Sequence, residues 1–161
     1  MPAHPGATSI GSCPPRIRQR IGARCMPPPP LSSTEAITEV ADRLFTAIEN
    51  GDRAEVDRMW SPDIAVWRVG ARRDNDKARA LRVIDWFLSA TTERRYEILD
   101  RRVFSDESAS GFVQQHTLHA TGRAGQVIAM RVCIVIKLDR DGVINRIDEY
   151  FDPSELAPLL D

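Results

Sequence analysis

Cysteine and histidine are scarce in this chain, which limits the kinds of fold and site it can build. The 161 residues include three Cys, at positions 13, 25 and 133, and three His. An odd, sparse set of cysteines without zinc-type spacing indicates neither a disulfide framework nor a structural zinc site. His116 and His119 are three apart on a predicted strand and so point to opposite faces, which predicts no metal site. The sequence therefore favours a reduced, cytoplasmic protein without a metal.

Long apolar runs and an excess of basic charge are also missing. No stretch reaches the roughly 20 apolar residues of a membrane-spanning helix. From Glu35 onward the chain carries 18 basic and 23 acidic side chains. Because nucleic-acid surfaces and anionic membranes both select clustered basic residues, the composition predicts neither partner. The chain lacks Gly-rich phosphate loops and dinucleotide fingerprints, so no cofactor is expected.

The first 34 residues differ in composition from the rest. They contain no Asp or Glu, four Arg and eight of the eleven Pro. An Arg-bearing, acid-free start is typical of targeting peptides, but there is no apolar run for a secretory signal and the prolines would break a transit-peptide helix. We therefore predict a disordered leader over residues 1–30, with initiation at Met26 as an alternative, and one domain over residues 31–161. A chain that begins at Leu31 is expected to melt at the temperature of the full chain.

Apolar residues recur at helical spacing in the first half of the chain. The spacing predicts helices over residues 32–50, 52–60 and 76–90, with a strand over residues 64–69. The first helix is predicted to begin at a capping box, in which the Ser32 side chain accepts from a backbone amide and Glu35 reaches back to the cap.

After Thr91 the apolar period changes to two. Strands are predicted over roughly 96–104, 111–120, 126–138 and 143–151, separated by turns. Helices first and a strand meander last indicate an α+β fold. We expect a curved antiparallel sheet wrapped around the N-terminal helices, because only a bent sheet buries both helical stripes against one concave face.

The last predicted strand combines carboxylates with aromatic residues and ends at Asp-Pro, in the segment Val143-Ile144-Asn145-Arg146-Ile147-Asp148-Glu149-Tyr150-Phe151-Asp152. It resembles the final strand of the nuclear transport factor 2-like superfamily, especially its SnoaL-like and limonene epoxide hydrolase-like branches. The segments 59–67 and 111–119 are similar to further passages of that superfamily. This resemblance, over nearly all of residues 35–161, implies a cone-shaped, cystatin-like α+β roll around one pocket. It also implies a small apolar, polyketide-like or terpenoid-like molecule as the partner.

The resemblance places two catalytic sets of the superfamily on this chain. In the epoxide hydrolases, a final-strand Asp, an Arg-x-Asp pair and an Asn fall at Glu149, Thr117-Leu118-His119 and Arg68. One of these four positions keeps its chemical type, so that mechanism is not expected. The ketosteroid isomerase base, oxyanion Tyr and protonated Asp fall at Arg68, Leu44 and Ile134, and that mechanism is not expected either. SnoaL-like cyclase chemistry stays open, with His119 and Glu149 as acid and base.

Strand parity tests whether the candidate groups converge. If Glu149 faces the pocket, Phe151 shares its face, while Asp148 and Tyr150 point outward. On the second strand of the meander, we assign His119 to the inner face and His116 to the outer face. The predicted catalytic residues are thus His119, Glu149 and Arg68, and the predicted substrate-binding residues are Trp67, Gln115, Thr117, Met130, Val132, Ile134 and Phe151.

Two functions remain open at this point. The first is cofactor-free isomerisation, cyclisation or hydration of a small apolar substrate, with Glu149 and His119 as a proton-transfer pair and Arg68 orienting the carboxylate. The alternative is a non-catalytic ligand-binding or dimerisation module, in which Arg68 and Glu149 form only a structural ion pair. A homodimer is expected in either case, because the outer sheet face would expose apolar surface at Cys133, Val135 and Tyr150.

Overall fold

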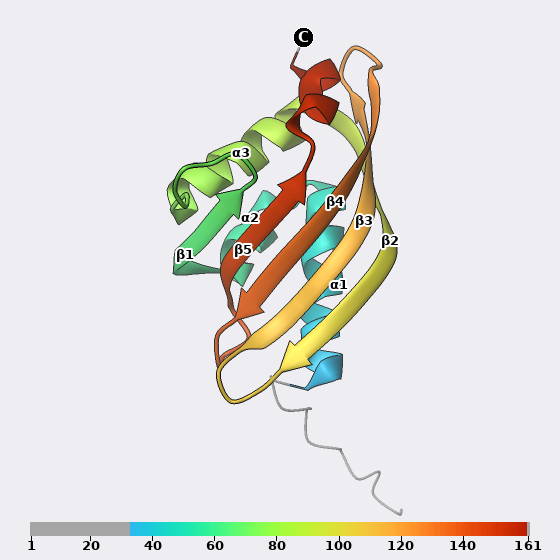
Figure 1. The fold of residues 1–161 in the computed structure, drawn as a ribbon. Helices are drawn as coiled ribbons and strands as arrows, with labels where there is room; N and C mark the ends of the chain where they lie inside the picture. Colours follow the sequence, from blue (N-terminus) through green and yellow to red (C-terminus); the bar gives the residue numbers. More distant parts are fainter. Residues whose placement is uncertain (1–32, 161) are drawn as a thin grey trace, which may run out of the picture.

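The computed structural model describes residues 33–160, and the predicted leader over residues 1–30 lies outside the described residues. Helices precede most of the sheet, which confirms the α+β prediction (Figure 1). The elements are α1 (Thr34–Asn50), α2 (Arg53–Met59), β1 (Trp60–Arg68), α3 (Lys77–Ala90), β2 (Thr91–Ser105), β3 (Ser110–Gly122), β4 (Val127–Leu138), β5 (Ile144–Phe151) and the 3-10 helix η1 (Pro153–Leu159).

The five strands form one sheet in the order β1-β5-β4-β3-β2. Strands β2 to β5 pair antiparallel as the predicted meander. Strand β1, however, pairs with β5 in parallel, so the sheet is mixed rather than wholly antiparallel. No hairpin joins these two strands, and the long chain between them leaves their relative direction unconstrained. Their pairing brings Arg68 directly opposite Glu149.

The sheet curves around α1, with α3 against β1 and β2 (Figure 1). The predicted stripe of α1 is buried, with Ile37, Leu44 and Phe45 at most 5% exposed. These side chains join those from the concave face of the sheet in one apolar core. Within residues 33–160, no helix is long and apolar enough to cross a membrane.

Helix α1 begins one residue later than the sequence pattern predicted. Its N-cap is Ser33, whose side chain accepts a hydrogen bond from the Ala36 amide at 3.1 Å. The capping box predicted at Ser32 is therefore wrong, because the third residue after the true cap is an alanine, which cannot return a hydrogen bond. The helix ends at Asn50 and is capped by Gly51, whose left-handed conformation (φ 72°) suits a residue without Cβ.

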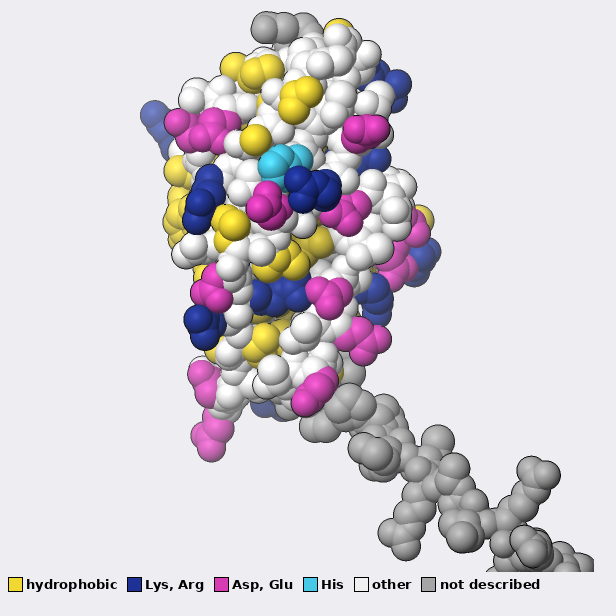
Figure 2. Space-filling model, turned by 90° about the vertical axis from the view of Figure 1, so that its right-hand side faces the viewer, with side chains coloured by type: hydrophobic (Ala, Val, Ile, Leu, Met, Phe, Trp, Pro, Cys, Tyr) yellow, Lys and Arg dark blue, Asp and Glu magenta, His cyan; other side chains and the backbone are white. Residues whose placement is uncertain are grey.

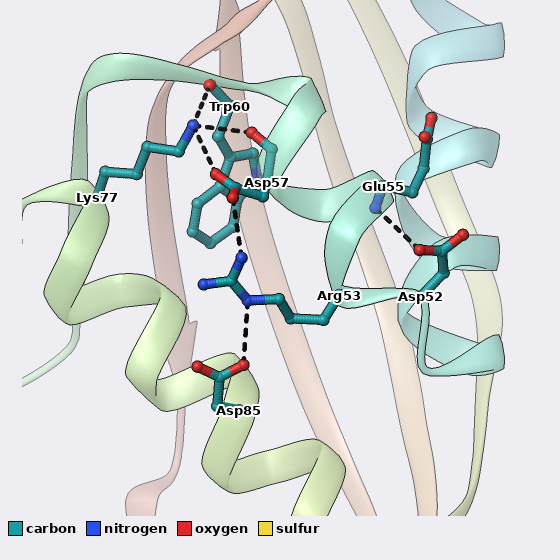
Figure 3. A network of polar contacts seen from close by, with 7 residues as sticks. All are labelled: Asp52, Arg53, Glu55, Asp57, Trp60, Lys77 and Asp85. Carbon is teal, nitrogen blue, oxygen red and sulfur yellow. Dashed lines mark hydrogen bonds and ion pairs between the residues drawn. The ribbon is translucent and has the colours of Figure 1, made fainter.

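A polar network fixes the start of α3 against the end of α2 (Figure 3). Lys77 Nζ donates to the carbonyl groups of Asp57 and Trp60 and pairs with the Asp57 carboxylate, each at 2.8 Å. The Lys77 hydrogen bond holds the pKa of Asp57 below its usual range. Arg53 bridges Asp57 on α2 to Asp85 on α3. The network keeps α3 where its apolar face can line the interior of the cone.

The junction between α2 and β1 differs from the prediction. Trp60, predicted to end the second helix, begins β1, and the strand therefore starts four residues before the predicted Ile64. Pro62 lies inside β1, but the register with β5 shifts between Trp60 and Ala65, where a residue without an amide hydrogen is tolerated.

Candidate functional site

A cavity of about 170 Å³ lies between the concave face of the sheet and the helices α1 and α3. Its wall is mainly apolar and is formed by side chains from α1, α3, η1 and all five strands of the sheet. Leu156 of η1 adds to this wall from the C-terminal end of the chain. The larger apolar side chains around it include Phe45, Ile84, Phe87, Met130, Val132 and Ile134.

The register of β3, β4 and β5 decides which side chains reach this cavity. Ile134 on β4 lies opposite Glu149, and Val132 lies opposite Phe151. Met130, two residues before Val132, points the same way. The structure therefore places four of the predicted binding residues on the cavity wall: Met130, Val132, Ile134 and Phe151.

Arg68 and Glu149 also line the cavity, as the sequence indicated. The Arg68 Nε donates to Glu149 Oε2, and the two side chains are 20% and 22% exposed. This partial exposure places the ion pair at the opening, between solvent and the apolar interior. The pair joins β1 to β5 through two residues that are 81 positions apart in sequence.

The predicted grouping of His119 with Glu149 is wrong. His119 lies on the outer face of the sheet, where its Nε2 is 2.7 Å from Glu97 Oε2, and this contact lowers the pKa of Glu97. Gln115 and Thr117 have the same parity as His119 and also point outward. Trp67 lies outside the cavity too, with its ring 5.2 Å from that of Tyr150.

His116, which the sequence analysis assigned to the outer face, lines the cavity instead. It lies opposite Val132 in the β3–β4 ladder and is 2% exposed. Its ring packs edge-on against Phe45 at 5.3 Å and Tyr96 at 5.0 Å. Burial lowers the pKa of His116 to about 4, and the charge of Arg101 acts in the same direction. His116 is consequently neutral at pH 7.

Tyr96 on β2 is a cavity residue that the sequence analysis did not identify. Burial raises the pKa of its phenol, and the negative charge of Glu149 raises it further. Tyr96 therefore remains a protonated hydroxyl that can donate a hydrogen bond. Tyr96 has the same strand parity as Arg94, whose Nε donates to the Ile48 carbonyl of α1, but this direction is visible only in the structure.

The remaining polar groups do not assemble into a metal site. Within the part of the chain that the structure describes, no three His, Cys, Asp or Glu side chains converge as metal ligands would. On the side along β2, basic and acidic side chains are interspersed (Figure 2). The titratable side chains on the cavity wall are Arg68, Glu149, Tyr96 and His116.

Comparison with known proteins identifies the fold. Residues 41–147 match the family model of the SnoaL-like domain. PrhC from Penicillium brasilianum superimposes with a TM-score of 0.68 and 16% identity, covering 78% of this chain and 86% of its own. An LEH-like epoxide hydrolase from M. tuberculosis gives 0.60 and 24% identity, covering 80% and 91%.

A third solved structure is SalBIII, an epoxide hydrolase/cyclase-like enzyme with a role in pyran ring formation in the polyether salinomycin. It superimposes with a TM-score of 0.65 and 14% identity, covering 77% of this chain and 96% of its own. No curated protein matches the chain. At these identities the solved structures establish the shared cone-shaped, NTF2-like fold.

Proposed function

The chain belongs to the SnoaL-like domain family, and we propose that it acts on a small, mostly apolar molecule by cofactor-free acid/base chemistry. The observation that carries this proposal is the Arg68–Glu149 pair at the opening of a mainly apolar cavity. Convergent polar groups in an apolar pocket are the usual form of a small-molecule site. Isomerisation, cyclisation and hydration are the reactions that such a site supports.

Each polar group has a distinct role in the proposed chemistry. Glu149 accepts a proton, either from carbon next to a carbonyl group or from a water molecule that attacks the substrate. Arg68 holds the carboxylate through its Nε hydrogen bond and is a positioning residue. Tyr96 donates a hydrogen bond to the oxygen on which negative charge develops. His116 replaces His119 as the histidine of the proposed site.

The cavity volume limits the size of the substrate. A dry apolar cavity of roughly 150 Å³ accommodates a benzene-sized molecule. The cavity here, at about 170 Å³, fits one six-membered ring with a small substituent. A larger polyketide-like or terpenoid-like molecule would leave part of its skeleton outside the opening, next to Arg68 and Glu149.

Proton exchange on a small ring ketone tests the proposal directly. Cyclohexanone in D₂O exchanges its α-hydrogens when a base removes them, and NMR measures the rate with and without protein. We expect Glu149→Gln to lower the protein-dependent rate roughly 100-fold, because general base catalysis contributes about that much. The control is Glu97→Gln, which removes a carboxylate on the outer face. Equal rates for wild type and Glu149→Gln would reject Glu149 as the base.

A non-catalytic ligand-binding module is the alternative, and the ion pair itself favours it. A carboxylate engaged by a guanidinium is already satisfied and need not take part in proton transfer. This alternative predicts that cyclohexanone and a six-membered-ring epoxide bind and raise the melting temperature of the protein. It also predicts that the ketone exchanges no α-hydrogens and that the epoxide ring does not open. Binding without reaction across a panel of cyclic ketones and epoxides would select this alternative.

We also propose a homodimer through the outer face of the sheet and a cytoplasmic location. Tyr150 is 48% exposed on that face and its ring packs at a tilt against that of Trp67, and Cys133 lies opposite Tyr150 on β4. Burial of this apolar area supports self-association. Sedimentation of wild type and Tyr150→Arg tests it, since a charge at the centre of the interface should yield monomers.

A further inference from the structure

A chain of polar side chains runs behind the cavity wall from the surface to His116. Asp42 on α1 accepts a hydrogen bond from Arg101 Nη1 at 2.6 Å. Arg101 Nε in turn donates to Gln114 Oε1 at 2.7 Å. Gln114 Nε2 lies 3.0 Å from His116 Nδ1. Gln114 is 0% exposed, so these partners decide how its amide is oriented.

This chain determines which nitrogen of His116 carries the proton. Arginine can only donate hydrogen bonds, so the Gln114 oxygen must face Arg101 and the Gln114 NH₂ must face His116. An amide NH₂ is also only a donor, so His116 Nδ1 must be the acceptor and carry no proton. The proton of the neutral ring therefore resides on Nε2.

The Nε2–H group is the donor that His116 can offer to a ligand. The ring lines the cavity with Nδ1 already engaged, and the neighbouring aromatic rings of Phe45 and Tyr96 hold it edge-on. A buried N–H group on a mainly apolar cavity wall is most stable when an acceptor reaches it. The acceptor it fits is a neutral oxygen, since an apolar wall solvates a charged ligand poorly.

We propose that His116 binds the oxygen atom of the ligand through Nε2–H, and that Gln114 and Arg101 are positioning residues that hold this tautomer. The ligand class is a neutral cyclic compound with one accepting oxygen, such as a ketone, ether or epoxide. The inference rests on the proposed function only in placing the ligand in the same cavity, and it assigns His116 a role as donor rather than base.

The tautomer is tested by long-range ¹H–¹⁵N NMR of the histidine rings between pH 5 and pH 8. We expect wild-type His116 to show an unprotonated Nδ1 and a protonated Nε2 throughout. Gln114→Glu places an acceptor beside Nδ1, so the proton should move to Nδ1 or a second proton should bind. Gln114→Met, which keeps the length without the donor, should show both tautomers. His119 serves as the internal control, with signals unchanged in both variants.

A protonated Nδ1 in the wild type, or the wild-type pattern in both folded variants, would overturn the proposal. Since both variants replace a buried residue, the wild-type spectrum alone already decides the tautomer if neither folds. A merely structural role for Gln114 would change stability without moving the ring proton.

Ligand selectivity is tested with cyclohexanone and methylenecyclohexane, which share a shape and differ in the accepting oxygen. The ratio of their dissociation constants is measured in wild type and in His116→Phe. We expect the preference for the ketone to fall roughly fivefold in the variant, as the loss of one neutral hydrogen bond implies. An unchanged ratio would reject the His116 donor.

The two proposals fail separately. If Glu149→Gln retains full proton exchange while the ketone preference falls in His116→Phe, the catalytic proposal is wrong and the His116 donor stands. If exchange depends on Glu149 while the ketone preference is unchanged in His116→Phe, the base is correct and the donor assignment is wrong.

Discussion

The buried, neutral His116 makes the stability of the fold depend on pH in a way that one substitution removes. In the unfolded chain its ordinary pKa is 6.5, and in the folded protein burial lowers the pKa to about 4. Between these values the unfolded state binds more protons than the native state. Stability from His116 is therefore fully present above pH 6.5 and is lost as pH falls toward 4.

The size of the effect follows from the same two values. Between pH 8 and pH 5, linkage gives a fall of about 2 kcal/mol in the free energy of unfolding from this one group. His116 is 2% exposed, so solvent screening does not reduce this figure appreciably. Arg68, Glu149 and Arg101 are also charged and lie near the cavity. They are present in both the wild type and His116→Phe, so their contributions to the pH dependence cancel in the difference between these two proteins.

Urea unfolding of wild type and His116→Phe at pH 5, 6, 7 and 8 measures this contribution. Phenylalanine fills the ring site without a titrating group, so the variant should lack the excess loss of stability at low pH even if its stability is lower throughout. His119→Gln is the matched control, and it should retain the wild-type slope. Parallel pH profiles for wild type and His116→Phe, or an NMR titration midpoint near 6.5 for His116 in the wild type, would refute the reasoning.

Two further predictions concern the scaffold. Lys77→Met removes a donor to two backbone carbonyl groups and a carboxylate, and urea unfolding should show a loss of about 1–3 kcal/mol. The exposed Lys137→Met should change stability little, and equal losses would show that the α2–α3 network is not stabilising. Gly111→Ala would place a Cβ 2.0 Å from the backbone oxygen of Ile136, so we expect a loss of about 3 kcal/mol or more. Gly122→Ala meets only the ends of flexible side chains and should melt closer to wild type.

Most of the architecture could be predicted because its signals are local. The 3.6-residue period of α1 and the two-residue period after Thr91 each define one buried face. Asp52 and Asp76 cap α2 and α3, and Asp152 caps η1, each at a position where an N-cap residue is expected. The parallel pairing of β1 with β5 had no such signal, because it joins segments that are distant in the sequence.

The residues that line the cavity were predicted in part. Glu149 was identified on the final strand, and Arg68 was identified through the family resemblance. The parallel register of β1 with β5 brings the two residues together. Tyr96 was missed because a single aromatic residue at the start of a strand pattern is usually a core residue. Its place on the cavity wall, where it is buried and feels the charge of Glu149, is revealed only by the tertiary structure.

The error on β3 has a physical origin that applies to other pocket proteins. Hydrophobic alternation shows which face of a strand is buried. Polar residues that point into a cavity weaken that alternation at the cavity positions themselves. On β3 the inward positions 114 and 116 are Gln and His, while the outward positions 115, 117 and 119 are Gln, Thr and His, so the centre of the strand gives no contrast.

Two other features of the β3–β4 hairpin do indicate which face of β3 is buried. The ends of the inward face on β3 are apolar, at Phe112, Leu118 and Ala120. Strand β4 alternates clearly, and in an antiparallel ladder the parity of one strand fixes that of its neighbour once the register is known. The observed pairs His116–Val132 and Leu118–Met130 follow that rule. The parity of a strand that carries polar cavity residues is therefore better inferred from its apolar neighbour than from the strand itself.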